Sequence, residues 1–157
     1  MILLTVGMQL GFDRLIRAMD RLAPELGERI VAQVGPGSYR PQHMEAHERL
    51  DPQEFERLAR EARLIVSHAG IGTLLTARRL NKPIVLFPRE ASLSEHRNDH
   101  QLATARQLAD RPAISVAYDE SELPLAVRRG LEMDRVEWAP PAALASLRQA
   151  VAQFIDE

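Results

Sequence analysis

A dense run of polar side chains, Glu95-His96-Arg97-Asn98-Asp99-His100-Gln101, is the part of the sequence best equipped for chemistry. His96 and His100 stand four residues apart, as two metal ligands on one helical face would, but no third ligand of suitable spacing accompanies them. The neutral donors and acceptors of Asn98, His100 and Gln101 suit the alternating hydrogen bonds of a sugar. The run therefore predicts hydroxyl recognition, with a merely solvated helix start as the alternative.

A glycine-containing turn, His68-Ala69-Gly70-Ile71-Gly72-Thr73, precedes this run and follows a strand-like apolar stretch. Glycine lets backbone N–H groups approach an anion, and the helix that follows adds a partial positive charge at its N-terminus. Gly70 and Gly72 are therefore compatible with phosphate binding, although tight strand-to-helix turns also use glycine for steric reasons alone. The full dinucleotide fingerprint and a P-loop lysine are both absent, which disfavours NAD and ATP.

Two basic residues stand next to predicted strand ends. His68 could bond a phosphate or a sugar hydroxyl, or it could bond to backbone and hold the turn. Arg89 follows the strand-ending Pro88, where a guanidinium could reach a diphosphate. A salt bridge from Arg89 to Glu90 or Glu95 is an equally compatible interpretation.

The elements that must position these residues alternate between strands and helices. Apolar runs predict strands at 2–6, 30–34, 64–67, 84–87 and 113–117, with a short edge strand between 44 and 50. Helical spacing predicts a first helix that begins at Phe12 and is stopped by Pro24 and Gly27, and a second that begins after the N-cap Asp51, with Glu54 closing a capping box. Further helices are predicted from the glycine-containing turn to Leu80, over 98–108, from Asp119 or Ser121 to about Gly130, and over about 141–155. This alternation is typical of an α/β fold with a single Rossmann-like, doubly wound, mostly parallel sheet and helices on both faces. Ligands of such sheets bind beyond the carboxyl ends of the strands.

Composition limits the other possibilities. With 157 residues and 45% hydrophobic content, residues 1–157 are expected to form one domain. A formal charge of −2 gives no electrostatic argument for nucleic acid. The absence of cysteine excludes disulfides and thiolate metal sites and suits a reducing cytoplasm. No signal peptide and no membrane span are predicted, so any membrane role would come from a partner.

Four stretches, in this order, resemble the C-terminal, donor-binding domain of family 28 glycosyltransferases. They are Thr5-Val6-Gly7-Met8-Gln9-Leu10-Gly11-Phe12-Asp13-Arg14-Leu15-Ile16, Ser67-His68-Ala69-Gly70-Ile71-Gly72-Thr73, Leu80-Asn81-Lys82-Pro83-Ile84 and Glu95-His96-Arg97-Asn98-Asp99-His100-Gln101-Leu102-Ala103. The resemblance covers nearly the whole chain. It is strongest to the small stand-alone subunits of split glycosyltransferases in bacterial exopolysaccharide synthesis and lipid-linked oligosaccharide assembly.

The resemblance implies the C-terminal half of a GT-B fold, which binds a UDP-sugar without a metal or another cofactor. The loop Gly7-Met8-Gln9 would face the diphosphate, the backbone near Leu50 would meet uracil, and His100 and Gln101 would read the sugar hydroxyls. The complete donor-binding set expected from residues and resemblance together is Gly7, Met8, Gln9, Leu50, His68, Gly70, Gly72, Thr73, Thr76, Arg89, Glu95, Asn98, His100 and Gln101.

Two positions depart from the family pattern. Relatives carry Thr or Ser where this chain has Met8, so the loop is expected to act here through its backbone. Thr76 replaces a glutamate that holds the ribose hydroxyls in relatives. A threonine hydroxyl cannot accept from both ribose hydroxyls, which puts donor affinity and nucleotide identity in question.

The resemblance further implies an inverting hexosyltransferase that adds a sugar to a lipid-linked, polyprenyl-diphosphate glycan in polysaccharide synthesis. The departing UDP would leave toward the helix N-terminus and Arg89. We expect the general base on a membrane-anchored, acceptor-binding partner subunit, with His68 as the candidate within this chain. That partner would recruit the cytoplasmic chain to the inner face of the membrane, and the 141–155 helix is a candidate contact surface, unless it packs on its own sheet. The alternatives are a non-catalytic nucleotide-sugar-binding or scaffolding subunit and, disfavoured by the single domain, a complete UDP-sugar epimerase.

Overall fold

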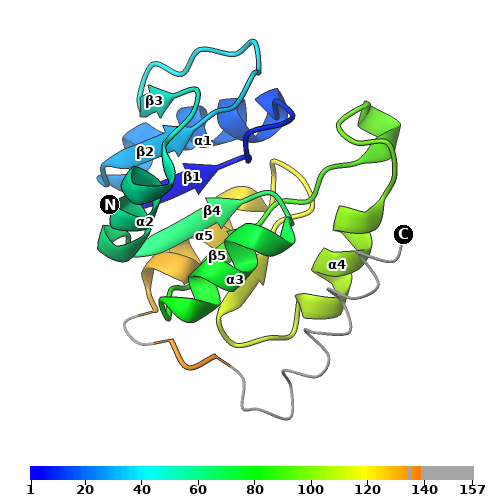
Figure 1. The fold of residues 1–157 in the computed structure, drawn as a ribbon. Helices are drawn as coiled ribbons and strands as arrows, with labels where there is room; N and C mark the ends of the chain where they lie inside the picture. The colour runs from blue at the N-terminus through cyan, green and yellow to red at the C-terminus, as the bar shows by residue number, and fades with distance from the viewer. Residues whose placement is uncertain (134–135, 139–157) are drawn as a thin grey trace.

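The computed structural model describes residues 1–133 and 136–138, and its centre is a six-stranded parallel sheet (Figure 1). The strands lie in the order β3-β2-β1-β4-β5-β6. Their bounds are β1 Ile2–Thr5, β2 Ile30–Gln33, β3 Glu45–His47, β4 Leu64–Ser67, β5 Ile84–Leu86 and β6 Ile114–Val116. The helices are α1 Asp13–Leu26, α2 Pro52–Glu61, α3 Ile71–Arg79, α4 His100–Leu108 and α5 Leu123–Leu131, with a 3-10 turn η1 at Ala91–Leu93. The predicted α/β fold class is confirmed.

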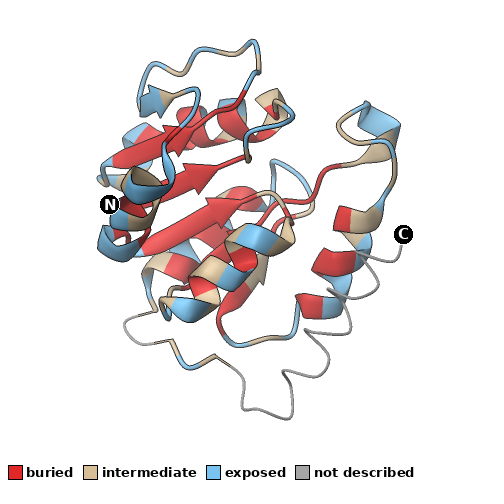
Figure 2. Ribbon diagram, viewed as in Figure 1, coloured by how far each residue is buried: buried red, intermediate tan, exposed pale blue. Residues whose placement is uncertain are grey.

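Helices cover both faces of the sheet, as predicted. Successive β1 residues point to opposite faces, so Leu4 packs with α1 and α5 while Leu3 packs with α2, α3 and α4. Every residue of β1, β2, β4 and β5 is buried, which explains why these strands are nearly continuous apolar runs (Figure 2). The edge strand β3 is largely exposed and correspondingly polar.

One detail of α1 and one of α2 differ from prediction. α1 contains Pro24 and ends only at Gly27, whose φ of 63° is the left-handed conformation that ends many helices. At α2, Asp51 accepts from the Glu54 N–H at 2.8 Å, but the Glu54 side chain pairs with Arg57, so only half of the capping box forms.

Two helices also begin later than predicted. α4 begins at His100 because Asn98 instead caps the preceding turn and accepts from the His100 N–H. α5 begins at Leu123 after a turn that Asp119 organises by accepting from the backbone of Ser121 and Glu122. The predicted helix at 141–155 lies outside the described residues.

The direction of strand addition reverses between β1 and β4. The chain adds β2 and β3 on one side of β1, then returns to place β4, β5 and β6 on the other. Open α/β sheets bind ligands at such a reversal, in the crevice expected between the loops at the carboxyl ends of the two central strands. Separately, no helix within residues 1–133 and 136–138 is long and apolar enough to cross a bilayer.

Candidate functional site

The loop after β1 forms one wall of this crevice. Gly7 has a φ of 78°, a conformation that side chains disfavour, and its N–H donates to Thr5 Oγ1 at 3.2 Å. Met8, Gln9 and Leu10 are exposed. A Cβ at Gly11 would lie 2.6 Å from the Gly37 Cα, so the loops after β1 and β2 touch through glycine backbone. The structure thus places Gly7-Met8-Gln9 in the loop after β1, and its contact with a diphosphate stays a prediction.

Arg89 lies beneath that loop, and its side chain does not pair with the carboxylates considered in the sequence. Only 2% of the residue is exposed. Its Nη1 donates to the Gly11 carbonyl at 2.6 Å, and its Nη2 donates to the carbonyls of Val6 at 2.8 Å and Leu10 at 3.0 Å. Burial lowers the pKa of Arg89 to about 10. In place of the expected contact with diphosphate, the guanidinium holds the loop.

The turn after β4 forms the opposite wall. Gly70 is the N-cap of α3 and no side chain caps this helix, so backbone N–H groups of its first turn are available to an anion. A Cβ at Gly70 would lie 2.2 Å from His68 Cε1, whereas a Cβ at Gly72 would meet nothing within 4 Å. Gly70 is therefore required by the packing of His68, while Gly72 faces open space.

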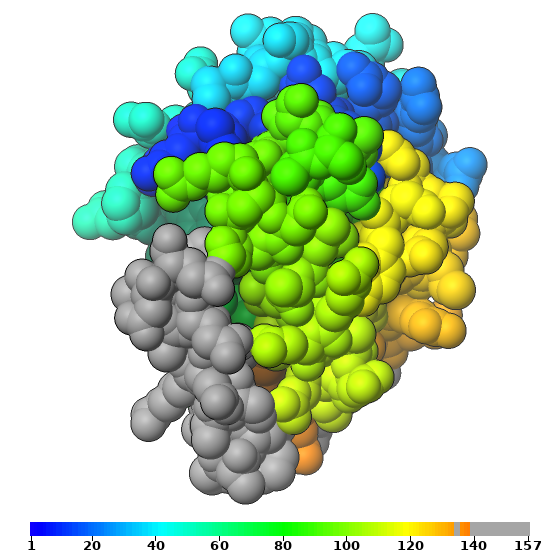
Figure 3. Space-filling view, turned by 90° about the vertical axis from the view of Figure 1, so that its right-hand side faces the viewer, coloured from blue at the N-terminus to red at the C-terminus, as the bar shows by residue number. Residues whose placement is uncertain are grey.

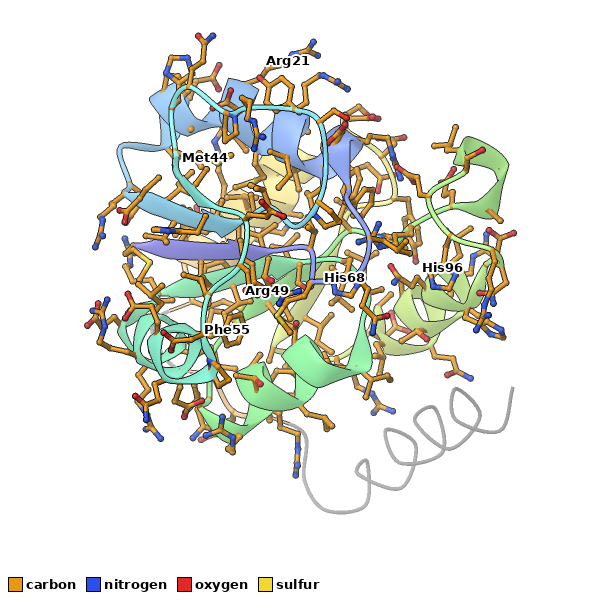
Figure 4. All side chains as sticks on the ribbon, turned by 45° about the horizontal axis from the view of Figure 1, so that its top comes forward. Arg21, Met44, Arg49, Phe55, His68 and His96 are labelled. Carbon is orange, nitrogen blue, oxygen red and sulfur yellow. The ribbon has the colours of Figure 1, made fainter. Side chains whose placement is uncertain are left out.

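His68 points from the end of β4 toward the β1 loop (Figure 4). Its Nε2 would lie 3.4 Å from a Cβ at Gly7, and its Nδ1 lies 3.1 Å from Gln101 Nε2. Burial, with the nearby positive charge of Arg89, lowers the pKa of His68 to about 4. The imidazole is therefore neutral at pH 7.

The hydrogen bonds of Gln101 determine which nitrogen of His68 carries the proton. Gln101 is buried, and its Oε1 lies 3.3 Å from the Ala69 N and 3.0 Å from the Arg89 N. Because two N–H groups converge on this atom, it must be the amide oxygen, and the atom facing His68 must be the amide nitrogen. His68 Nδ1 is then an acceptor, and Nε2 carries the proton as a hydrogen-bond donor toward the crevice.

The low pKa of His68 predicts a specific loss of stability in acid. An unfolded histidine takes up a proton near pH 6.5, whereas folded His68 does so near pH 4. The contribution of neutral His68 to the free energy of unfolding should therefore be complete above pH 6.5. It should fall by up to about 3 kcal/mol as the pH drops toward 4. Urea unfolding between pH 7 and 4 measures this free energy, and its decrease with falling pH should be less steep in His68→Gln. Equal slopes in the two proteins would contradict the assignment.

A buried polar chain fixes the segment expected to meet uracil. Leu50 N–H donates to Gln33 Oε1 at 2.9 Å, and Gln33 Nε2 donates to Thr5 Oγ1 at 3.0 Å. Thr5 Oγ1 also accepts from the Gly7 N–H. Gln33 and Thr5 are both buried, so one network ties the carboxyl ends of β1 and β2 to the Leu50 backbone and the glycine loop.

The Glu95–Gln101 run does not present all of its groups to one ligand. The Glu95 carboxylate accepts from Arg14 Nε and Nη2, both at 2.9 Å, and from the Glu90 N–H at 3.1 Å. Asn98 Oδ1 accepts from the His100 N–H. Figure 4 shows His96 before α4 and His68 at the end of β4 as separate positions. Asn98 and His100, both partly exposed, remain the run's candidates for sugar hydroxyls.

Thr76, at the position where the resemblance implies a ribose-binding glutamate, uses its hydroxyl proton locally. Its Oγ1 donates to the Gly72 carbonyl at 3.1 Å, within the first turns of α3. The oxygen can then only accept from a ligand hydroxyl while this bond persists. Thr73 occupies the first turn of the same helix and is partly exposed.

Three contributors to the site were missed in the sequence: Thr5, Gln33 and Arg14. Thr5 and Gln33 each interrupt the apolar character at the last position of a buried strand, a signal that could have been used. The Arg14 guanidinium carbon lies 4.5 Å from the centroid of the Phe87 ring, and the guanidinium pairs with Glu95. No comparable sequence signal predicts this long-range pair.

The hollows in the described residues lie both near the crevice and away from it. One of about 360 Å³ opens at the carboxyl edge between Gly11, Gly37, Leu93 and Glu95. A larger one of about 990 Å³ opens at the opposite edge beside Lys82 and Trp138. Within the described residues, no group of three or more His, Cys, Asp or Glu side chains is arranged to hold a metal. The prediction that no metal is needed stays a prediction.

Comparisons with known proteins agree on the fold. The family model described as the glycosyltransferase family 28 C-terminal domain matches residues 1–153. No curated protein matches the chain in sequence.

Among solved structures, the chain is similar to MurG of Acinetobacter baumannii (TM-score 0.61, 18% identity, 96% of this chain and 49% of that one). It is also similar to the spinosyn forosaminyltransferase SpnP (TM-score 0.61, 19% identity, 99% and 39%). A third is glycosyltransferase SsfS6 of Streptomyces sp. SF2575, complexed with thymidine diphosphate (TM-score 0.56, 19% identity, 99% and 37%). The chain thus spans less than half the length of each of these proteins.

Proposed function

The chain belongs to the glycosyltransferase family 28 C-terminal domains, and from this premise we propose that it is the donor-binding half of a UDP-sugar-dependent inverting hexosyltransferase. One observation carries the proposal. At the reversal between β1 and β4, the glycine loop and the uncapped start of α3 face each other, with the neutral Nε2–H donor of His68 directed between them. Such a site suits a diphosphate without a metal.

Each part of the crevice would take one part of the donor. The backbone of Gly7-Met8-Gln9 and the first turn of α3 would bind the diphosphate, and the Leu50 backbone, fixed through Gln33, would meet the base. Asn98 and His100 would meet the sugar. Gln101 Nε2 carries two hydrogens and donates one of them to His68. Only the second would be left to donate to a sugar hydroxyl.

The proposed reaction is a single displacement at the anomeric carbon. The acceptor hydroxyl oxygen forms a bond to that carbon as the bond to the diphosphate oxygen breaks, and UDP departs with the electron pair. His68 Nε2–H, with the α3 amides, would stabilise the departing oxygens. Because Nε2 already holds a proton, His68 is poorly suited to act as general base. We therefore assign the acceptor's proton to a base on the partner.

The acceptor side is proposed from the family resemblance alone. The matched family domain is a C-terminal domain, and the chain spans 37–49% of the similar structures named above. We propose a membrane-anchored partner that binds a lipid-linked, polyprenyl-diphosphate glycan and completes the cleft at the cytoplasmic face. Co-expression with such a partner should give transfer from a UDP-sugar, and neither chain alone should. Transfer by this chain alone would overturn the two-component proposal.

A non-catalytic nucleotide-sugar-binding or scaffolding subunit is the second candidate. The donation of the Thr76 hydroxyl to the Gly72 carbonyl favours this candidate. Thr76 cannot accept from both ribose hydroxyls, as the glutamate implied for relatives would. Binding of UDP-sugar without transfer in the complex would support this candidate. SsfS6 was solved with thymidine diphosphate, so UDP and dTDP should be compared directly.

Thr76→Glu is expected to strengthen UDP binding about tenfold, because a carboxylate can accept from both ribose hydroxyls and charged hydrogen bonds contribute more than neutral ones. Calorimetric titration with UDP measures the change. Deoxy-UDP, which lacks one of the two hydroxyls, should gain much less. An equal gain for both nucleotides, or none for UDP, would place the ribose elsewhere.

A further inference from the structure

Arg89 is buried in a way that the proposed binding of a donor does not explain. It is the largest fully buried side chain in the described residues, and it comes from the segment after β5. Its planar fork reaches carbonyls of three residues on the β1 loop and, at 3.4 Å, the carbonyl of Glu95. The guanidinium carbon also lies 4.6 Å from the Phe12 ring centroid.

These contacts replace an ordinary ion pair. The Glu95 carboxylate is engaged by Arg14, and Arg89 meets only the Glu95 backbone carbonyl. Burying a guanidinium without a directly bonded carboxylate is costly unless its donors are satisfied. Here four carbonyls accept from the Nη1 and Nη2 groups, so loop conformation and charge burial depend on each other.

The geometry of the peptide unit gives this arrangement a consequence on the outer side of the loop. In a trans peptide the C=O and the following N–H point in opposite directions. With the carbonyls of Leu10 and Gly11 directed inward to Arg89, the N–H groups of Gly11 and Phe12 are directed away from it, at the start of α1. The buried charge also lies behind these amides, so both effects favour an anion in front of the loop.

We propose that Arg89 is a positioning residue: it fixes the Val6–Gly11 loop from inside and so directs the loop backbone toward the donor diphosphate, without contacting the ligand. The role toward the diphosphate rests on the proposed function, whereas the order of the loop in the free protein does not. Through the Glu95 carbonyl the same fork joins this loop to the segment that precedes α4. Figure 3 shows that segment next to the N-terminal residues on one face of the molecule.

The first test is hydrogen exchange of the free protein. Arg89→Met and Arg89→Lys should both exchange at least about tenfold faster over residues 6–12, because lysine keeps the charge but lacks the planar fork. Residues 64–67 of β4 report on global unfolding, and their exchange should rise much less than that of residues 6–12. Arg79→Met, which removes an exposed ion pair with Glu56, is the matched control and should leave both segments unchanged. If Arg89→Met fails to fold, Arg89→Lys carries the test.

The second test is UDP binding, with chemical rescue. Both Arg89 variants should bind UDP about tenfold more weakly. Millimolar guanidinium should restore binding to Arg89→Ala, and tetramethylammonium should not. Weaker binding with an unchanged loop would make Arg89 a direct ligand and overturn the proposal, as would a loosened loop with unchanged affinity. If the wild-type protein binds no UDP, the proposed function fails. Independently of that result, unchanged exchange over residues 6–12 in the variants would overturn the positioning role of Arg89.

Discussion

Gly70→Ala should destabilise the protein by about 1–3 kcal/mol and abolish donor binding. The added Cβ would lie 2.2 Å from His68 Cε1 and 2.9 Å from each ring nitrogen. The Gly70 φ of −86° is ordinary for alanine, so the cost comes from the displaced ring and not from the backbone. Moving the ring breaks its bond with Gln101 and removes the Nε2–H donor from the crevice. Urea unfolding and calorimetric titration with UDP measure the two effects.

Gly72→Ala is the matched control, because it is the same substitution two residues away. A Cβ at Gly72 meets nothing within 4 Å, and the residue lies in α3. Alanine should therefore stabilise the helix by about 0.5–1 kcal/mol. If the diphosphate lies against this turn, the methyl group should still weaken UDP binding. Unchanged UDP affinity in both variants would show that the turn does not bind the donor.

Gln101→Glu should reverse the tautomer of His68 and raise its pKa by more than one unit. A carboxylate can still accept from the N–H groups of Ala69 and Arg89, but it cannot donate to His68 Nδ1. The ring must then carry a proton on Nδ1, and the adjacent negative charge favours the imidazolium. Nitrogen chemical shifts of His68, measured across a pH series, report both changes. We expect transfer activity to fall at least about a hundredfold, because Nε2 no longer donates to the leaving diphosphate.

Gln107→Glu controls for the charge, since it makes the same change at an exposed position of α4. The tautomer and pKa of His68 should stay as in the wild-type protein there. If the neutral imidazole of His68 still carries its proton on Nε2 in Gln101→Glu, then the orientation of the Gln101 amide, and with it the donor role of His68, is wrong.

The core of the fold could be predicted from the sequence because its signal is local. Runs such as Leu64–Ser67 are apolar throughout since both faces of the sheet are covered, and β3 is polar since it lies at the edge. Helix ends were less predictable. Pro24 stands inside α1, and the segment that begins at Asn98 completes a turn before the helix starts at His100.

The roles of the polar residues could not be predicted because their partners are distant in the chain. Arg89 meets the Val6 carbonyl 83 residues away, and His68 meets Gln101 33 residues away. Residue type suggested that Arg89, Glu95 and Gln101 would face a ligand. In the structure, most of their polar atoms instead bond to side chains or backbone groups of other loops. Which groups meet depends on how the whole fold packs.

The proposed function requires that a nucleoside diphosphate binds in the crevice between the β1 loop and the α3 turn. Titration of isotope-labelled protein with UDP, followed by amide chemical shifts, tests it most directly. The largest changes should fall on residues 7–12 and on His68 to Thr73. The contradicting result is saturable binding that shifts Lys82 and Trp138, beside the hollow of about 990 Å³ at the opposite edge of the sheet, while both loops stay unchanged.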